Sequence, residues 1–595
     1  MRISKIRIVN FSNFANLEVE TGENIVIVGE NKVGKSNFLW ALQLVLDPGL
    51  SELDRRLGLE HFWDGLGENK LGATVEVSVE LTDFDDNPDL IACLADAIVS
   101  PGPPTVARLT YRFRPMASLG GKPPESLAQY EYVIFGGTDE NNSIGAPLRR
   151  RLPLDVQAAL RDAEKDLLSW RRSPLRPLIE ELTEDLDADA REEILQMVRE
   201  AQTELADRDE VVSTAERIGK RLLDIVGDKH AVPIKLGLAP TRVDALLRGL
   251  RILIDNGARG VSDASLGTAN LIFLALKSLE LDRLVVEGER NHTFFGIEEP
   301  EAHLHPHVQR LVYRYFLGVN AAPAQQPRSL STILTTHSPH IASVAPLRSI
   351  VLLRKDVTQG ATIATSSAKV PLEEREVSDL QRYIDVTRGE LFFARGVIFV
   401  EGDAERFLIP AFAEKLGIHL DVLGISVCSV SGVNFTPYVK LLSTRSLHIP
   451  HVVITDMDPT EGGEPLAIRR ISKMLQARNG PPTAPGLTNE RIIELGEASG
   501  FFVNENTLEI DVFKAGLGPA MCDVLEQEIP FNDKSKAIID TWRKDAGKLD
   551  RERFLKAVER VGKGRFAQAL APHITPAACP SYIRKALEYI RNAVS

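Results

Sequence analysis

The carboxylates in the second half of the chain have the spacing of ligands in a phosphate-processing metal site. Glu401 directly follows an apolar stretch, and Asp456 and Asp458 directly follow another. In a strand, the i, i+2 spacing places both aspartates on one face, and Glu405 would share a helix face with Glu401. Because these ligands are all oxygens, they favour Mg²⁺ or Mn²⁺ over zinc. Two such ions can activate water and stabilise the leaving oxygen when a phosphodiester bond is cut.

Two later motifs offer groups that would complete this site. The segment TLEID at residues 507–511 contains Glu509, a candidate ligand for a second ion. Lys563 lies between Gly562 and Gly564, and its ammonium group would neutralise charge that builds up on a cleaved phosphate. Taken alone, the aspartate pair is equally well explained as part of a solvated rim, and the lysine as an ordinary surface residue. The prediction of a metal site therefore rests on the whole set.

The segment GENKVGKS at residues 29–36 is a complete phosphate-binding loop. A buried-strand pattern precedes it and a helix-competent stretch follows it, which is the context that this motif requires. Backbone N–H groups of such a loop wrap the phosphates, Lys35 reaches the β- and γ-phosphates, and Ser36 ligates the Mg²⁺ of the nucleotide. The residues predicted to bind ATP in this loop are Gly29, Asn31, Gly34, Lys35, Ser36 and Asn37.

Motifs further along the chain support ATP hydrolysis. The apolar segment at residues 293–297 ends in Glu298, which would hold Mg²⁺, and Glu299, which would act as general base on the attacking water. Glu298 stands where most ABC-type ATPases have aspartate, which favours slow or regulatory turnover.

Two more segments resemble ABC-type ATPases. Ser265 and Gly267 lie in a sequence like the signature loop, and His337 follows the next predicted strand, where those ATPases place a switch histidine. ABC-type heads hydrolyse ATP between two copies, and the signature loop of one chain caps the nucleotide of the other. This order of motifs therefore implies a homodimer or a larger homo-oligomer.

The apolar pattern predicts an α/β fold in two parts. Strands are expected at residues 3–9, 24–29, 74–81, 109–113, 130–135, 294–297, 331–335, 396–400 and 451–455, a helix at 36–46, and a polar connection at 356–369. The predicted domains are an ABC-type P-loop ATPase head at residues 1–152 and 236–375, a helical insertion at 153–235, and a Rossmann-like domain at 376–595. The insertion is either a solvated helical segment or a dimer contact, because amphipathic helices serve both purposes.

Length, charge and cysteine content limit which classes of protein this chain can belong to. A chain of 595 residues with net charge −13 is too long for one core and is not a broadly basic nucleic-acid coat, although a local basic groove remains compatible with that charge. No run of about 18 apolar residues occurs, so a membrane span is not expected. The four cysteines lack metal-ligand spacing and fit reduced, buried thiols in a cytoplasmic protein.

Together these motifs resemble the overcoming-lysogenization-defect (OLD) family of nucleases, which pair an ABC-type ATPase with a C-terminal Toprim domain. The segments RGELFFA at residues 388–394 and KGRFA at 563–567 are especially similar. The resemblance implies DNA as substrate, a role in phage defence or DNA processing, and, in the helicase-associated class that the Gabija nuclease exemplifies, a superfamily 1 helicase partner. It further implies two metal ions held by Glu401, Glu405, Asp456, Asp458 and Glu509, with Lys563 assisting catalysis.

The expected function is thus an ATP-regulated, metal-dependent DNA endonuclease. The alternative is a structural ATPase that clamps DNA and has a Toprim fold that does not cut. The complete set of acids argues against that alternative. A topoisomerase would need a catalytic tyrosine in a DNA-gate domain, and a primase would need a zinc-binding or template-binding module. The sequence shows neither of these features.

Overall fold

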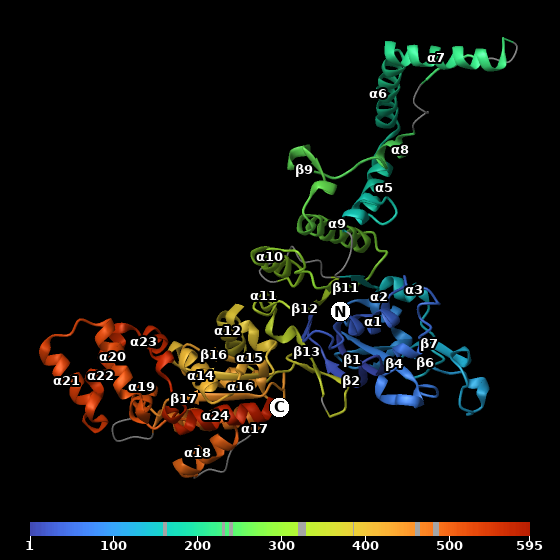
Figure 1. Ribbon diagram of the computed structural model, residues 1–595. Helices are drawn as coiled ribbons and strands as arrows, with labels where there is room; N and C mark the ends of the chain where they lie inside the picture. The colour runs from blue at the N-terminus through green and yellow to red at the C-terminus, as the bar shows by residue number, and fades with distance from the viewer. Residues whose placement is uncertain are drawn as a thin grey trace. The chain divides into compact units, whose positions relative to one another are not determined.

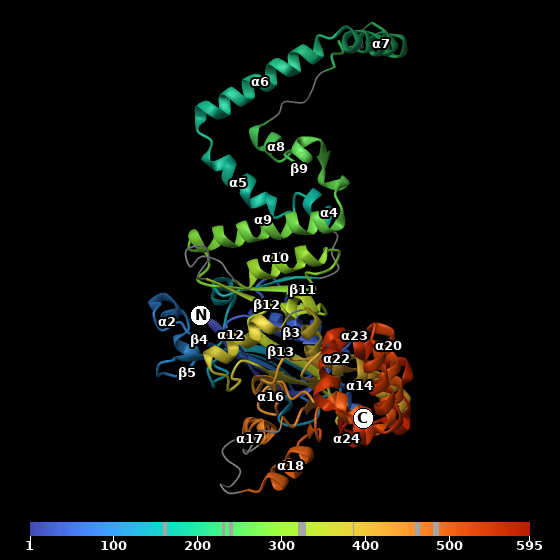
Figure 2. The same ribbon diagram turned by 90° about the vertical axis from the view of Figure 1, so that its left-hand side faces the viewer.

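The computed structural model describes residues 1–158, 163–228, 232–236, 242–318, 329–356, 358–384, 386–458, 465–479 and 487–594. The chain forms two compact units. One unit comprises Met1–Ala159 and Asn291–Ser595, and the other is Leu160–Arg290. Figures 1 and 2 show the elements of both. Among the described helices, none has the length and apolar character needed to cross a bilayer.

The first unit begins with a six-stranded antiparallel sheet. Its path runs β2-β1-β4-β6-β5, and β7 pairs with β6. The bounds are β1 (Arg2–Phe11), β2 (Phe14–Glu20), β4 (Val75–Thr82), β5 (Ile98–Ser100), β6 (Val106–Pro115) and β7 (Tyr130–Gly136). The predicted strands at residues 3–9, 74–81, 109–113 and 130–135 are therefore confirmed.

The second sheet positions the phosphate loop. Its order is β14-β13-β3-β12-β11-β8, and the pairs from β13 to β8 are parallel. The bounds are β3 (Ile25–Gly29), β8 (Leu154–Gln157), β11 (Thr293–Glu298), β12 (Leu330–Thr336), β13 (Ile350–Lys355) and β14 (Thr362–Ser366). Every residue of β3 is buried, as expected for a central parallel strand covered on both faces. Helix α1 (Lys35–Leu46) follows the loop and shares one apolar core with both sheets.

Two strands of this sheet were not predicted. The polar connection expected at residues 356–369 contains β14, which pairs antiparallel with β13 and buries the Thr362 hydroxyl against Val33 O at 2.8 Å. The segment at Leu154–Gln157, expected to begin the helical insertion, is the edge strand β8 and pairs with β11. Both strands are short and pair along only one edge, so periodicity gives a weak signal for them.

The connecting helices of the first unit are short. They are α2 (Pro88–Cys93), α3 (Ala146–Arg151), α10 (Pro306–Phe316), α11 (Pro339–Ala342), α12 (Glu374–Tyr383) and α13 (Val386–Gly389). Helix α10 begins with proline at its first turn, a position where no backbone donor is lost. Its buried face presents Val312, Tyr313 and Phe316.

The third sheet is four-stranded and parallel, in the order β16-β15-β17-β18. Its elements are β15 (Gly396–Val400), α14 (Asp403–Lys415), α15 (Leu420–Leu423), β16 (Ile425–Ser429), α16 (Thr436–Leu442), β17 (His451–Thr455), α17 (Leu466–Asn479), α18 (Asn489–Ala498) and β18 (Phe501–Val503). The predicted strands at residues 396–400 and 451–455 match β15 and β17. Both are buried along their whole length.

A helical bundle follows the third sheet. It contains α19 (Leu508–Val512), α20 (Gly518–Glu528), α21 (Asp533–Lys544), α22 (Arg551–Val561), α23 (Lys563–Leu570) and α24 (Ser581–Val594). The bundle and the sheet share one apolar core, in which Ile398 and Ile454 of the strands belong with Ile583 and Leu587 of α24. This shared core holds the start of α23 in a fixed place beside the sheet.

The second unit is helical. Its elements are α4 (Ala163–Leu168), α5 (Leu175–Asp185), α6 (Ala188–Ala206), α7 (Asp209–Val226), α8 (Val243–Leu247), β9 (Leu253–Ile254), β10 (Arg259–Gly260) and α9 (Leu266–Val286). The insertion expected at residues 153–235 corresponds to most of this unit, which also includes α9 and therefore extends further. Residues 159–162 and 229–231 of that insertion lie outside the described part of the chain.

Candidate functional site

The phosphate loop lies between β3 and α1. Gly34 adopts φ 100°, and a Cβ there would meet the Asn13 side chain at 2.0 Å, so only glycine fits. The Lys35 ammonium group donates to Gly29 O and Glu30 O, each at 3.1 Å. Burial lowers the pKa of Lys35 to about 8, against the opposing charges of Glu299 and Glu301. Lys35 is thus held inside the loop where a phosphate would meet it.

The rest of the loop has the exposure expected of ligand-facing groups. Asn31 and Ser36 are exposed. Asn37 donates to Asn13 Oδ1 at 2.9 Å and so braces the loop from inside. Of the residues predicted to bind nucleotide, these and Gly29, Gly34 and Lys35 therefore lie together at the end of β3 and the start of α1.

The catalytic candidates of the ATPase lie beside the lysine. His337 follows β12, and its Nδ1 is 3.3 Å from Lys35 Nζ while its Nε2 is 3.2 Å from Glu299 Oε1. Burial, reinforced by the Lys35 charge, lowers the pKa of His337. Glu299 has φ 42°, a left-handed conformation that is costly for glutamate and typical of functional sites. The structure therefore brings Lys35, Glu299 and His337 together.

Glu301, which was not among the predicted site residues, fixes this histidine. Its Oε1 accepts from His337 N and from the Thr336 hydroxyl, each at 2.8 Å, and its Oε2 accepts from the Tyr313 hydroxyl at 3.0 Å. Glu298, the predicted Mg²⁺ ligand, is the last residue of β11. Because β11 and β12 are parallel neighbours, these acids and His337 meet at the same sheet edge.

The predicted signature loop belongs to the other unit. Ser265 caps α9 by accepting a hydrogen bond from Thr268 N at 3.2 Å, and Gly267 is buried in the first turn. Their predicted role toward the nucleotide of a second copy stays a prediction.

The second site lies at the carboxyl ends of the strands in the third sheet. Glu401 follows β15, Asp456 and Asp458 follow β17, and Glu405 lies in the first turn of α14. Glu509 comes from α19, and Lys563 is the first residue of α23. Parallel strands bring their carboxyl ends to one edge, so residues far apart in sequence become neighbours there.

Glu401 and Asp458 are joined by an arginine. Glu401 Oε1 accepts from Asp456 N at 2.8 Å and from Arg470 Nη1 at 2.9 Å, and it also accepts from the Thr455 hydroxyl. Arg470 Nη2 donates to Asp458 Oδ2. Asp458 adopts φ 45°, which supports a constrained local geometry. Arg470 therefore fixes two predicted ligands relative to each other.

Asp456 and Glu405 lie in an environment that disfavours their ionised forms. Burial raises the pKa of Asp456 to about 8, and the charges of Glu401, Glu405 and Glu509 add to the effect. Burial likewise raises the pKa of Glu405 to about 7, with contributions from Glu509 and Glu401. Desolvation and mutual repulsion of this kind are typical of functional sites. Four of the predicted carboxylates thus form one electrostatically coupled cluster, and Arg470 joins Asp458 to it.

Lys563 forms an ion pair with Glu509. Its Nζ lies 3.2 Å from Glu509 Oε1, and half of its side chain is exposed. Burial lowers the pKa of Lys563, but the charges of Glu509, Asp456 and Glu405 outweigh it and raise the pKa. A Cβ on Gly564 would lie 3.3 Å from Asp403 Cβ, so glycine lets α23 approach α14 closely.

The donor chemistry of the cluster suits a divalent cation. Buried carboxylates with raised pKa values gain most from a cation that relieves their repulsion. Among the described residues, however, no three His, Cys, Asp or Glu side chains are arranged to hold an ion as they stand. Arg470 donates to one oxygen of Glu401 and one of Asp458. Asn504 donates to one oxygen of Asp456, and Lys563 pairs with one oxygen of Glu509. Ion binding would therefore rearrange these side-chain contacts.

Two polar residues of this site escaped prediction, Arg470 and Asn504. Asn504 directly follows β18, donates to Asp456 Oδ1 and accepts from Met457 N at 2.8 Å. Its position after a short strand was an available signal, since polar residues after parallel strands converge. Arg470 lies in α17 between ordinary helix residues, and no sequence pattern marks it.

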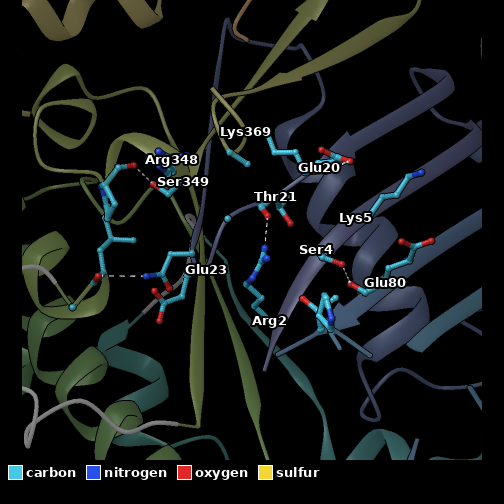
Figure 3. Close-up of a pocket in the computed structure, with 18 residues that line it drawn as sticks. Arg2, Ser4, Lys5, Glu20, Thr21, Glu23, Glu80, Arg348, Ser349 and Lys369 are labelled. Atoms are coloured by element: carbon cyan, nitrogen blue, oxygen red, sulfur yellow. Dashed lines mark hydrogen bonds and ion pairs between the residues drawn. The ribbon is translucent and has the colours of Figure 1, made fainter. Parts of the chain in front are cut away.

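A cavity of about 870 Å³ lies elsewhere, among β1, β2, β4 and the segments around β13 and β14 (Figure 3). The cations that line it have acidic partners: Arg2 pairs with Asp83, Arg348 with Glu374 and Lys369 with Glu20. It contains neither the phosphate loop nor the carboxylate cluster.

Comparisons with known proteins identify two domain types in the chain. A family model described as "Overcoming lysogenization defect protein-like, TOPRIM domain" matches residues 392–458, and one described as "AAA ATPase domain" matches residues 155–342. The C-terminal region of the Burkholderia pseudomallei OLD protein is 54% identical, over 34% of this chain and 100% of that one, with a TM-score of 0.33.

Two curated relatives are more distant. The OLD nuclease of Thermus scotoductus is 23% identical over 521 residues, which are 85% of this chain and 91% of that protein. The endonuclease GajA of Bacillus cereus is 25% identical over 294 residues, and the match spans 42% of this chain and 41% of GajA. The protein is thus an α/β chain with an N-terminal ATPase head and a C-terminal Toprim domain, two domain types that use a nucleotide and divalent metal.

Proposed function

Because this chain belongs to the OLD family of nucleases, we propose that it is a metal-dependent DNA endonuclease that cuts phosphodiester bonds at the Toprim carboxylates under control of its ATPase head. The observation that carries this proposal is the buried cluster in which Asp456 and Glu405 have raised pKa values beside Lys563. A clamp that only binds DNA would not need mutually repelling buried acids.

The residues proposed to hold the ions are Glu401, Glu405, Asp456, Asp458 and Glu509. Mg²⁺ or Mn²⁺ bound there would supply an activated water and stabilise the leaving oxygen. Lys563 would donate to a non-bridging or leaving oxygen of the phosphate, because its side chain is half exposed and its ammonium group is held at the cluster by Glu509. Asn504 keeps Asp456 oriented through the hydrogen bond to its Oδ1.

Regulation by ATP would act through side-chain contacts between the phosphate loop and the residues before β15. Glu30, inside the phosphate loop, accepts from Arg395 Nε at 2.8 Å, and Arg395 directly precedes β15, which ends just before Glu401. Arg354 adds a second link by donating to Ala394 O at 2.7 Å. A change in the phosphate loop on ATP binding would thus reach the strand that carries a metal ligand.

In the proposed ATPase cycle, Lys35 and Ser36 bind the phosphates and Mg²⁺, Glu299 positions the attacking water, and His337 contacts the γ-phosphate. The signature residues Ser265 and Gly267 would complete this site in a second copy, so the active form would be a homodimer or larger. We further propose a role in phage defence or DNA processing, with a superfamily 1 helicase as partner.

The test is cleavage of supercoiled plasmid with Mg²⁺ or Mn²⁺, with and without ATP, by the wild type, Asp456→Ala and Lys35→Ala. We expect metal-dependent nicking or linearisation by the wild type and its loss in Asp456→Ala. Lys35→Ala should keep the chemistry and lose only the response to ATP. Stable DNA binding by the wild type without cleavage under every condition would instead support the DNA-clamp alternative.

A further inference from the structure

Arg470 is nearly buried at the centre of the carboxylate cluster. It is the fifth residue of α17, the helix that begins at Leu466, and only 12% of its side chain is exposed. Its guanidinium group donates to Glu401 Oε1, to Asp458 Oδ2 and to the Thr455 hydroxyl. A single planar cation therefore bridges the carboxylates that follow β15 and β17.

Arginine carries a permanent positive charge, which affects the carboxylates around it. The guanidinium group stays protonated and offers only donors. Burying it is unfavourable unless acids are paired with it, and here two acids are paired. In return, the arginine offsets the repulsion between the Glu401 and Asp458 carboxylates that it bridges.

We propose that Arg470 is a resident counter-cation that holds Glu401 and Asp458 in register when no ion is bound and competes with divalent metal for them. This inference rests on the proposed function, because it takes Glu401 and Asp458 to be metal ligands. Arg470 acts through these carboxylates and is therefore a positioning residue. Metal binding at the pair requires the guanidinium group to withdraw from at least one of them.

Competition follows from the atoms involved. Arg470 donates to Glu401 Oε1, and this oxygen also accepts from Asp456 N and the Thr455 hydroxyl. With three donors around it, Glu401 Oε1 can bind an ion only if one of them leaves. A divalent ion at these oxygens would also lie within a few ångströms of a like charge, and such repulsion is strong where water is scarce. Removing the guanidinium charge should thus strengthen ion binding.

The experiment measures Mn²⁺ binding by titration calorimetry, without nucleotide, on the full-length wild type and Arg470→Gln. Arg470→Lys keeps the charge but cannot bridge both carboxylates. Arg491→Gln is the matched control, since it removes the same charge from an exposed pair with Glu494 on the neighbouring helix α18. Glu401→Gln in each background identifies the binding that belongs to this site.

We expect Arg470→Gln to bind Mn²⁺ at least tenfold more tightly than the wild type, Arg470→Lys to lie between them, and Arg491→Gln to match the wild type. In EDTA at pH 8, the melting temperature of Arg470→Gln should be lower, and its rise on adding Mn²⁺ larger, than in the control. Unchanged or weaker Mn²⁺ binding by Arg470→Gln would show that Arg470 is merely a structural brace.

A measurement on the wild type covers the case in which Arg470→Gln does not fold. In a crystal structure with Mn²⁺, Arg470 should have left Glu401, Asp458 or both, and a guanidinium group still bonded to both carboxylates beside the ion would overturn the inference. The two failures are distinguishable. If Glu401→Gln does not change Mn²⁺ binding by the protein, the metal site itself is refuted. If Glu401→Gln weakens Mn²⁺ binding but Arg470→Gln leaves it unchanged, only the competition is refuted.

Discussion

Asp456 lies among groups that oppose its ionisation. Burial raises its pKa to about 8, and three neighbouring carboxylates add to that effect. An unfolded aspartate ionises near pH 4, so the folded protein binds a proton more tightly than the unfolded chain. The stability contributed by this group is therefore complete below about pH 4 and is lost as the pH rises towards 8.

Asp456→Asn should therefore stabilise the metal-free protein in a pH-dependent way. The neutral amide removes the buried charge, so the gain in unfolding free energy in EDTA should grow by on the order of 4 kcal/mol between pH 5 and pH 8. Thermal unfolding at both pH values measures it. A gain that is the same at pH 5 and pH 8 would contradict the raised pKa.

Lys563 should contribute to chemistry and little to ion binding. Lys563→Ala is expected to lower the single-turnover cleavage rate by about 10²–10³-fold, the usual effect of losing a donor to the reacting phosphate. Its Mn²⁺ affinity should stay within a few-fold of the wild type, because the half-exposed Lys563 pairs with one oxygen of Glu509 and does not bridge two carboxylates among the described residues. Arg565→Ala is the matched control, since it removes a neighbouring cation of α23 that pairs with Glu528. An equal loss of cleavage in that control would show that the general basicity of α23 matters more than Lys563.

Among single residues, Glu401, Asp456 and Asp458 were predicted because they follow recognisable strands, and Glu405 from its helical spacing to Glu401. The assignment of Lys563 depended on the family resemblance. Arg470 and Asn504 were missed since their roles come from contacts across 69 and 48 positions of sequence. Such contacts exist only once the strands have paired.

Helices α14 and α23 set the position of Lys563 relative to Glu405. They pack closely because Gly564 has no side chain, and a Cβ there would lie 3.3 Å from Asp403 Cβ and 3.7 Å from the Phe407 ring. That approach is tight for one methyl group and too tight for a branched side chain. The close packing of α23 against α14 therefore explains why glycine follows Lys563.

Gly564→Val should move α23 away from α14 and lower cleavage at least tenfold through displacement of Lys563. Gly564→Ala, which adds one carbon at 3.3 Å, should keep the rate within about threefold. Plasmid cleavage rates for the two variants measure the difference, with circular dichroism to confirm folding. If the valine variant cuts as fast as the alanine variant, the close packing does not position the lysine.

At the scale of elements, buried strands were predicted well and edge strands poorly. β3, β15 and β17 are mostly apolar and are buried along their whole length, a pattern that the sequence reveals. β8 and β14 have partly exposed edges and polar residues. Their place depends on neighbours such as β11 and β13, which local sequence does not reveal.

Helix α7 of the helical unit carries an apolar stripe that is partly exposed in the described part of the chain. Residues of α7 recur with the alternating four- and three-residue spacing of a coiled coil, at Val211, Ala215, Ile218, Leu222 and Ile225. Ile218 is 44% exposed and Ile225 is 72% exposed. Apolar side chains spaced in this way favour a second copy of the chain as their partner, in line with the dimer proposed for the ATPase head.

Ile218→Glu combined with Ile225→Glu should therefore lower the mass of the protein in light scattering. The control is Ser213→Glu with Thr214→Glu, which adds the same charge at exposed positions of α7 outside the stripe. An unchanged mass in the isoleucine variant would exclude this stripe as a contact between copies. The sequence left the role of the insertion open, because a solvated helix and a dimer contact have the same periodicity.

If Asp456 is a metal ligand of a nuclease, exchanging its carboxylate for a thiolate should change which ions support cleavage. Plasmid cleavage should be measured for Asp456→Cys and Asp456→Ala with Mg²⁺, Mn²⁺ and Cd²⁺. Thiolate prefers soft ions over Mg²⁺, so we predict that the cysteine variant is inactive with Mg²⁺ and recovers cleavage with Cd²⁺, while the alanine variant stays inactive. Equal behaviour of the two variants with every ion, or cleavage by the wild type in EDTA, would contradict the account.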